Sequence, residues 1–293
     1  MAKLIFDKME ASGNDFVVVS IISFLGSRSS SFEQGGSAAV GQVFSKARNF
    51  SALVKKLCHR RFGVGADGML LLTDSRRADI RMRIFNADGS EAQMCGNGAR
   101  CCALWLKHYF GRPRRKKSFE LETLAGIIKT EVDEKNRVRI KLTDPFDFKL
   151  DIPLKIYGRA IRVNFVNTGV PHTVIFCSGL DDIDVLKIAP QIRYHRYFSP
   201  SGTNVNFVEV LSPTAIKLRT YERGVEDETL ACGTGSVASA LIFSLKADQR
   251  HSIKVHTRGK EVLTVYYKRD DTKFSDVWLE GKARFVFRGE MEI

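Results

Sequence analysis

Two cysteines of the chain begin the same short motif. Cys95 opens Cys-Gly-Asn-Gly-Ala-Arg-Cys-Cys-Ala and Cys232 opens Cys-Gly-Thr-Gly-Ser-Val-Ala-Ser-Ala, and each motif runs into an apolar segment. The first turn of a helix has backbone N–H groups without intrahelical acceptors, and glycine lets an anion approach them closely. The positive end of a helix also lowers the pKa of a thiol. The motif therefore predicts a carboxylate-binding helix start that carries a reactive thiol.

Two such thiols on opposite faces of one carbon could invert a stereocentre. A thiolate would remove a proton from one face, and a thiol would deliver a proton to the other. The chain has no signature of pyridoxal phosphate binding, so backbone N–H groups would have to stabilise the carbanion. One preorganised donor at a developing oxyanion is worth roughly 2.7–4 kcal/mol. A single motif could be a helix start with a buried cysteine, but the duplication favours a function.

The repeat has a weaker part upstream of each cysteine. Gly13-Asn14-Asp15-Phe16-Val17-Val18 lies 82 residues before Cys95, and Gly169-Val170-Pro171-His172-Thr173-Val174 lies 63 residues before Cys232. A Ser/Gly-rich stretch at 20–48, expected to be an exposed insertion, accounts for the longer first interval. The pattern predicts two homologous lobes, each with one cysteine at the start of one central helix.

The remaining periodicity indicates many short strands and few helices. Helices are expected at 51–60, 99–109 and 237–245, and a turn at 12–15. Strands are expected at 4–6, 16–19, 69–72, 120–122, 126–132, 138–142, 161–166, 173–176, 206–210 and 277–287. This organisation differs from that of a doubly wound βαβ enzyme.

A glycine pattern at 63–68, Gly-Val-Gly-Ala-Asp-Gly, matches the dinucleotide-binding fingerprint. The fingerprint needs a strand before it and a helix after it. Here the expected helix comes first and the strand follows, so we interpret the pattern as a tight helix-to-strand turn. The chain also has no P-loop motif.

Composition indicates a folded globular protein of about two domains, with 293 residues of which 44% are hydrophobic. The longest nearly apolar stretch, 16–25, is too short to span a membrane. Charged residues interrupt the N-terminal segment, so no secretory signal peptide is expected. We therefore expect a cytoplasmic protein with no membrane partner. The net charge of +13 allows a nucleic-acid-binding protein as a distant alternative, but no basic stripe with stacking aromatics is evident. The basic cluster at 112–117 fits a solvated loop better than a phosphate-binding patch.

The spacing of the cysteines and histidines matches no zinc site, so no metal is expected. A disulfide framework is also unexpected in a chain of this kind. Four cysteines lie outside the duplicated position and are interpreted as packing residues: Cys58, Cys101, Cys102 and Cys177.

Several motifs together resemble the diaminopimelate epimerase family. They are KMEASGNDF at 8–16, RFGVGADG at 61–68, RIFNADGSEAQMCGNGARC at 83–101, NTGVPH at 167–172, GTNVNFVEV at 202–210 and YERGVEDETLACGTGS at 221–236. The resemblance implies an α+β fold of two pseudo-symmetric lobes, each a strand-rich barrel around a central helix, with the active site in the cleft between them. The N-terminal lobe would be 1–142, with 282–293 returning to it, and the C-terminal lobe 143–281.

The resemblance also implies a function and a site. The enzyme would interconvert LL- and meso-diaminopimelate, without a cofactor, in lysine and peptidoglycan precursor biosynthesis, and it would be a homodimer. Cys95 and Cys232 would be the acid/base pair, with His172 and Glu222 assisting the thiols and the substrate ammonium. The substrate-binding residues would be Gly96, Asn97, Gly233 and Thr234 at the α-carboxylate, and Asn14, Asn86, Asn204 and Arg223 at the distal end.

Some alternatives stay open. Asn86 could cap a turn, and Glu222 with Arg223 could be a surface ion pair. Val170 and Gly68 replace residues that contact substrate in some family members. A proline or histidine racemase on the same scaffold is the nearest alternative function, although a distal site favours a substrate with a second amino acid group.

Overall fold

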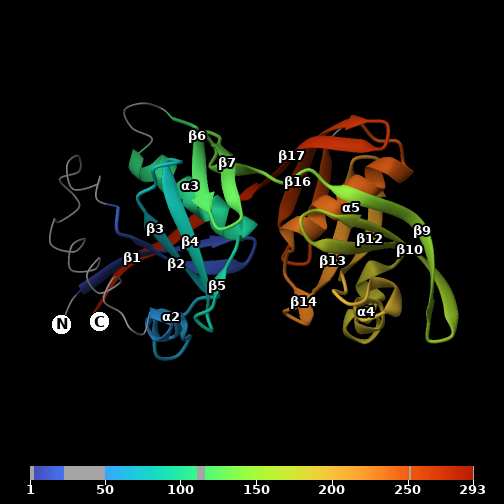
Figure 1. Ribbon diagram of the computed structural model, residues 1–293, viewed down its shortest axis with the longest axis horizontal. Coiled ribbons are helices and arrows are strands. Elements are labelled where there is room, and N and C mark those ends of the chain that lie inside the picture. Colours follow the sequence, from blue (N-terminus) through green and yellow to red (C-terminus); the bar gives the residue numbers. More distant parts are fainter. Residues whose placement is uncertain (1–2, 23–49, 111–115, 251, 293) are drawn as a thin grey trace. The chain divides into compact units, whose positions relative to one another are not determined.

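The computed structural model describes residues 3–22, 50–110, 116–250 and 252–292. Those residues divide into two compact units, the first drawn from 1–140 and 282–293 and the second from 141–281 (Figure 1). Most of the insertion expected at 20–48, and 112–115 of the basic cluster, lie outside the described residues. No helix in the described ranges has the length and apolar character needed to cross a membrane.

The first unit contains two helices and nine strands in its described part. They are β1 (Lys3–Ala11), β2 (Asn14–Ser20), α2 (Phe50–Cys58), β3 (Gly68–Thr73), β4 (Ile80–Asn86), β5 (Glu91–Ala92), α3 (Gly96–Phe110), β6 (Ser118–Thr123), β7 (Gly126–Val132), β8 (Arg137–Lys141, which ends one residue past the unit) and β18 (Arg284–Glu292).

The second unit follows the same plan. It contains β9 (Phe146–Ile156), β10 (Arg159–Asn167), β11 (Pro171–Phe176), η2 (Leu180–Asp182), α4 (Val185–Arg193), η3 (Arg196–Phe198), β12 (Asn204–Ser212), β13 (Ala215–Glu222), β14 (Asp227–Thr229), α5 (Gly233–Lys246), β15 (Ile253–Thr257), β16 (Val262–Asp270) and β17 (Lys273–Lys282, whose last residue belongs to the first unit).

Strand pairing is the same in both units. In the first, β18, β1, β2, β3, β4, β6, β7 and β8 pair in this order, and β5 pairs with β4. In the second, β9, β10, β11, β12, β13, β15, β16 and β17 pair in this order, and β14 pairs with β13. The strand pairs β2–β3, β4–β6, β11–β12 and β13–β15 are parallel, and a helix connects the two strands of each, as parallel pairing requires.

One long helix lies inside each unit. Helix α3 packs against β1, β4, β6 and β7, and α5 packs against β10, β11, β12, β13, β15 and β16. Ten consecutive residues of each helix are buried, Asn97–Leu106 and Gly235–Ser244. A helix buried on every side needs small or apolar residues all round, which explains the Gly, Ala, Ser and Cys that follow each motif. The α+β fold of two related, strand-rich units is thereby confirmed.

The shorter helices cover the other face of each sheet. Val54 and Leu57 of α2 pack with Met69 and Leu71 of β3, whereas Leu70 faces α3, where it lies against Gly98. In the second unit α4 packs with β12 in the same way. A strand covered on both faces is apolar on both, so β3 reads as an uninterrupted apolar run.

Most expected elements are present, with different lengths. The strand at 126–132 is confirmed as β7, and the turn within 12–15 is confirmed as a two-residue hairpin at Ser12 and Gly13, both with positive φ. Helices α3 and α5 begin earlier than expected because the glycines of the motif already belong to the first turn. The glycine pattern at 63–68 is confirmed as a helix-to-strand connection, in which a Cβ on Gly63 would lie 1.9 Å from the Lys56 carbonyl oxygen.

The single strand expected at 277–287 is wrong. The segment forms two strands, interrupted at Ala283. The first, β17, pairs with β16, and the second, β18, pairs with β1. Both strands are apolar enough to read as one, because hydrophobic pattern does not reveal which neighbour a strand pairs with. Strand β18 occupies in the first unit the place that β9 occupies in the second.

Removal of 283–293 should destabilise the first unit selectively. Strand β1 would lose its neighbour β18 along its length and expose an unpaired edge. We expect hydrogen exchange, followed by mass spectrometry, to show loss of protection in β1 and β2 while β10 to β13 stay protected. Equal loss in both units, or no loss in β1, would contradict this role of β18.

Candidate active site

Cys232 is the N-cap residue of α5. Its carbonyl oxygen accepts the first helical hydrogen bond from the Ser236 N–H at 2.9 Å, and its Sγ accepts from the Gly235 N–H at 3.4 Å. The thiol is buried, with a relative exposure of 8% for the residue. The N–H groups of Gly233 and Thr234 belong to the same first turn, where helical geometry provides no acceptor.

Gly235 must be glycine because two groups lie where a side chain would begin. A Cβ there would lie 2.4 Å from Oδ1 of Asn206 and 3.2 Å from the Sγ of Cys232. The last glycine of the motif thus lets the thiol and a neighbouring strand approach the helix together.

Cys95 has the equivalent place at the start of α3. Its carbonyl oxygen accepts from the Ala99 N–H at 2.9 Å, and the residue is half-buried. Gly98 matches Gly235, since a Cβ there would lie 3.0 Å from Cδ2 of Leu70. Gly96 and Asn97 supply the first-turn N–H groups.

Glu222 lies beside Cys232. Its Oε1 accepts from the Thr229 hydroxyl at 2.6 Å, and its carboxyl group also forms a hydrogen bond with the Cys232 thiol. Burial and then the charge of Glu222 raise the pKa of Cys232 well above its usual range, despite the opposing effects of Thr234 and the Gly235 N–H. The helix start does lower the thiol pKa through the Gly235 N–H, but desolvation and Glu222 outweigh this effect, so the net pKa of Cys232 is raised. The raised pKa keeps Cys232 in its protonated thiol form at pH 7.

His172 lies on β11 and is fully buried. Burial, reinforced by the positive charge of Arg223, lowers the pKa of its imidazole to about 3. Its ring is therefore neutral at pH 7. Nδ1 lies 3.1 Å from the side-chain nitrogen of Asn206.

Asn204 connects two neighbouring segments of the second unit. Its amide donates to the Pro171 carbonyl oxygen at 3.0 Å and accepts from the Arg223 N–H at 2.9 Å. The guanidinium of Arg223 donates to the Ser201 carbonyl oxygen at 3.2 Å, which leaves further N–H groups for another acceptor. Arg223 and Glu222 form no ion pair with each other among the described contacts.

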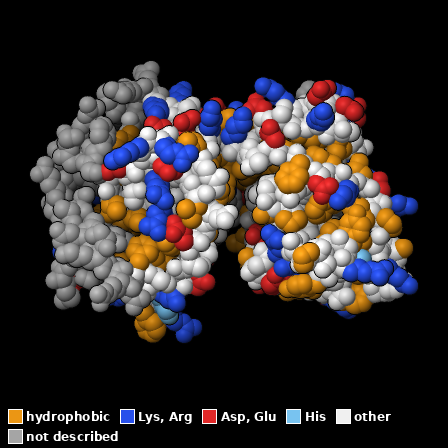
Figure 2. Space-filling view, viewed as in Figure 1, with side chains coloured by type: hydrophobic (Ala, Val, Ile, Leu, Met, Phe, Trp, Pro, Cys, Tyr) orange, Lys and Arg blue, Asp and Glu red, His pale blue; other side chains and the backbone are white. Residues whose placement is uncertain are grey.

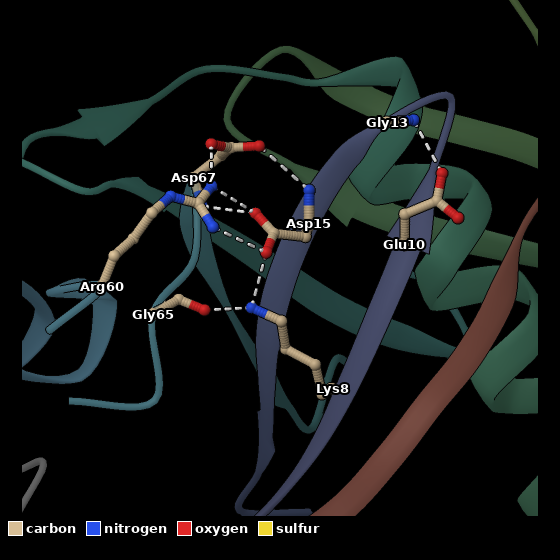
Figure 3. Close-up of polar contacts among 7 residues, drawn as sticks. All are labelled: Lys8, Glu10, Gly13, Asp15, Arg60, Gly65 and Asp67. Atoms are coloured by element: carbon tan, nitrogen blue, oxygen red, sulfur yellow. Dashed lines mark hydrogen bonds and ion pairs between the residues drawn. The ribbon is translucent and has the colours of Figure 1, made fainter. Parts of the chain in front are cut away.

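In the first unit a cluster of charged side chains surrounds Asp15, the residue after Asn14 (Figure 3). Asp15 pairs with the buried Lys8 at 2.7 Å and with Arg60 at 2.9 Å. Its backbone N–H donates to Asp67 Oδ2, and the Asp67 N–H donates back to the Asp15 carbonyl oxygen at 3.0 Å. These bonds outweigh the desolvation of the Asp15 carboxyl, so its pKa is lowered well below its usual range. The cluster fixes the turn that carries Asn14.

The two other first-unit asparagines expected to bind substrate, Asn86 and Asn97, already have partners. Asn86 is exposed and donates from its side chain to the Ser90 hydroxyl at 3.0 Å, so the turn-capping alternative describes its observed contact. Asn97 Oδ1 accepts from the buried Arg100 at 2.6 Å, and Arg100 also donates to the Ser12 hydroxyl at 2.6 Å. Arg100 thereby connects the helix start to the β1–β2 turn.

Gly68 opens β3, where a Cβ would lie 2.6 Å from the Phe85 carbonyl oxygen. A side chain at this position would collide with β4, so the glycine meets a packing requirement.

Among the packing cysteines, Cys58, Cys101 and Cys102 are buried and Cys177 is half-buried. Burial raises the pKa of Cys58 to about 11.

The sequence interpretation missed a duplicated ion pair. Arg83 binds Glu91 through two hydrogen bonds of 2.8 Å, and Arg219 binds Glu228 through bonds of 2.7 and 2.8 Å. Each pair connects the strand before the motif to the short strand that leads into it. Each glutamate stands four residues before its cysteine. The signal was available, since the repeat extends backwards as Arg, then Glu, then Cys-Gly-x-Gly.

Comparison with known proteins gives a consistent result. A family model described as diaminopimelate epimerase matches residues 31–146 and 164–286. The chain is 40% identical to the diaminopimelate epimerase of Aquifex aeolicus over 292 residues, which cover 98% of this chain and 97% of that one. It is 42% identical to that of Archaeoglobus fulgidus over 304 residues, which cover 99% and 97%.

Solved structures share the fold at low identity. A phenazine biosynthesis protein of the PhzF family from Bacillus anthracis aligns over 100% of both chains with a TM-score of 0.69 and 19% identity. A probable proline racemase from Agrobacterium radiobacter aligns over 99% of this chain and 92% of that one, with a TM-score of 0.64 and 14% identity.

Replacement of Lys8 by methionine should test the charged cluster. Loss of the buried Lys8 leaves Asp15 with the exposed Arg60 as its remaining cationic partner, so we expect a decrease of about 1.5–3 kcal/mol in the free energy of unfolding. Lys3→Met on the same strand is the control, because its pair with Glu290 is exposed and should contribute at most about 1 kcal/mol. Urea denaturation measures both; equal effects would contradict a structural role for the cluster.

Replacement of Glu222 by glutamine should make Cys232 more reactive. The charge of Glu222 raises the thiol pKa, so its removal lowers that pKa and increases the thiolate fraction at pH 8. We expect iodoacetamide to alkylate Cys232 several-fold faster, as measured by mass spectrometry of its peptide. Glu209→Gln is the matched control, since Glu209 raises the pKa of Cys177 and its loss should accelerate only that thiol. An unchanged or slower rate at Cys232 would contradict the assignment.

Proposed function

Because this chain belongs to the diaminopimelate epimerase family, we propose that it interconverts LL- and meso-diaminopimelate by proton transfer between Cys95 and Cys232. It is an isomerase. The observation that carries the mechanism is the duplicated helix start, which the same topology builds in both units with a cysteine at its first position. The reaction belongs to lysine and peptidoglycan precursor biosynthesis.

The two cysteines would divide the chemistry between them. In one direction the thiolate of Cys95 accepts the α-proton, and the thiol of Cys232 donates its proton to the opposite face of the carbanion. The raised pKa of Cys232 supports this assignment for the free enzyme. The reverse reaction exchanges the roles. The reaction requires both sulfurs to flank one α-carbon and takes no step through a cofactor or metal.

The helix starts would hold the α-carboxylate. Gly96, Asn97, Gly233 and Thr234 have first-turn N–H groups, which stabilise charge that develops as the α-carbon loses its proton. Specific donors contribute more than the helix dipoles, which give about 0.3–1 kcal/mol each at exposed ends.

The distal amino acid end would be held by Asn14, Asn86, Asn204 and Arg223. The Oδ1 atom of Asn14 is buried and has no hydrogen-bond partner among the described residues, which fits an acceptor for a substrate ammonium. Arg223 suits bidentate binding of a carboxylate. Glu222 and His172 would assist the thiols and the substrate ammonium. Asn86 would have to exchange its bond to Ser90 for one to substrate.

Other functions fit less well. A proline or histidine racemase needs no site for a second amino acid group. A nucleic-acid-binding protein needs a continuous basic surface, whereas Figure 2 shows Lys and Arg interspersed with Asp, Glu and apolar side chains on the visible face. From the family resemblance we also expect a cytoplasmic protein that forms a homodimer. Analytical ultracentrifugation would test the oligomeric state.

Replacement of either reactive cysteine by alanine should abolish epimerisation in both directions. A general acid or base contributes about 10²-fold or more, and neither thiol can perform both steps. Proton exchange in deuterium oxide, followed by NMR with diaminopimelate, proline and histidine side by side, measures activity and specificity together. Cys101→Ala is the control in the first unit and Cys177→Ala in the second, and both should mainly alter stability. Near-wild-type turnover of folded Cys95→Ala or Cys232→Ala would overturn the two-thiol mechanism.

A further inference from the structure

Asn206 lies on β12, fully buried, with both ends of its side-chain amide fixed. The amide nitrogen donates to the Thr173 carbonyl oxygen at 2.9 Å, and Oδ1 accepts from the Thr220 hydroxyl at 3.0 Å. A carbonyl oxygen can only accept a hydrogen bond. The end that faces Thr173 is therefore the nitrogen, and the orientation of the amide follows from its partners.

The second hydrogen of this NH₂ group is directed to His172. The Asn206 nitrogen lies 3.1 Å from Nδ1, and an amide NH₂ can only donate. Nδ1 must therefore accept, so the proton of the neutral ring is on Nε2. That Nε2 atom is buried and has no hydrogen-bond partner among the residues that the structure describes. The ring thus presents one unpartnered N–H donor in a fixed direction.

The first unit shows that the fold does not need this polar pair. His172 and Asn204 are opposite each other in the parallel pair β11–β12, as Phe16 and Gly68 are in β2–β3. By the same register Asn206 corresponds to Leu70. Gly235 and Gly98 confirm the match, because each approaches one of these two side chains most closely.

An apolar pair therefore fills the same place in one unit that a buried histidine and asparagine fill in the other. Burial of polar groups costs free energy unless every group is satisfied, and Nε2 is not. Packing alone explains Phe16 and Leu70, but it does not explain His172 and Asn206.

We propose that Asn206 is a positioning residue that holds neutral His172 with its proton on Nε2, so that His172 meets the bound substrate complex as a hydrogen-bond donor. The group that it meets must be an acceptor, which a carboxylate or a thiolate is and an ammonium is not. The substrate ammonium is then left to the carboxylate of Glu222. This inference rests on the proposed function only for the identity of the substrate.

Nitrogen NMR of the full-length protein with ¹⁵N-labelled histidine tests the tautomer without substrate. The signals of His172 are assigned by their loss in His172→Gln. We expect the wild-type ring to carry its proton on Nε2. In Asn206→Asp a carboxylate replaces the donor and accepts a hydrogen bond from Nδ1–H, so we expect the proton to move to Nδ1 and the Nε2–H tautomer to be lost. We expect kcat to fall about 10²- to 10⁴-fold, with a smaller change in KM, as when a catalytic histidine is held in the wrong tautomer.

Asn164→Asp is the matched control. Asn164 is also buried in the second unit, but it binds the Val174 carbonyl oxygen and the Asp151 N–H. It should leave the His172 signals unchanged. If Asn206→Asp does not fold, Asn206→Leu introduces the residue that the first unit has at this position; we expect a mixture of tautomers and at least a tenfold loss of kcat.

A wild-type proton on Nδ1 would overturn the proposal. So would an unchanged Nε2–H signal with near-wild-type kcat in either Asn206 variant. If the wild-type protein failed to epimerise diaminopimelate, the proposed function would be wrong, whereas the NMR result on the tautomer would still stand.

Discussion

The structure of each unit depends on a buried helix whose first-turn N–H groups have no acceptor within the helix. Peptide N–H groups that lie inside a protein without an acceptor cost free energy, and a solvated helix end would avoid this cost. Both units instead leave the start of their central helix only partly exposed and place a cysteine directly before its first turn. The thiol of Cys232 satisfies one N–H, that of Gly235. The other N–H groups of the first turn have no acceptor within the helix, which makes each helix start suited to an anion.

The two units solve one structural problem and then diverge. Their strand order, their parallel crossovers and their arginine–glutamate pairs are shared. The side chains that face the helix starts are not. By strand register Asn86 of the first unit corresponds to Glu222 of the second, but Asn86 binds Ser90 whereas Glu222 contacts Cys232. A duplicated scaffold thus presents two different chemical surroundings, and in the second the carboxylate of Glu222 raises the pKa of the Cys232 thiol.

Much of this could be predicted from the sequence because the motif is short-range. Within four residues, Cys-Gly-x-Gly at a helix start combines an N-cap, glycines that let other groups approach the backbone closely, and a thiol. Its chemistry can therefore be inferred without knowledge of the tertiary structure. The pKa of Cys232 could not be predicted, since it depends on burial and on Glu222, ten residues away in sequence. Nor could the break at Ala283, because two consecutive strands with similar apolar character belong to different units. Asn206 did not stand out because β12 contains other polar residues, and its role follows only from its correspondence with Leu70 of the first unit.

The return of the last strand to the first unit has a consequence for synthesis. The second unit is one continuous stretch, 141–281, and all of it is synthesised before β18 is made. The first unit begins earlier but lacks β18 until residues 284–292 have been made, so until then β1 has no neighbour on that edge of its sheet. The half of the chain that is translated first is therefore completed last. During that interval an unpaired edge of β1 is open to the nascent chains of neighbouring ribosomes.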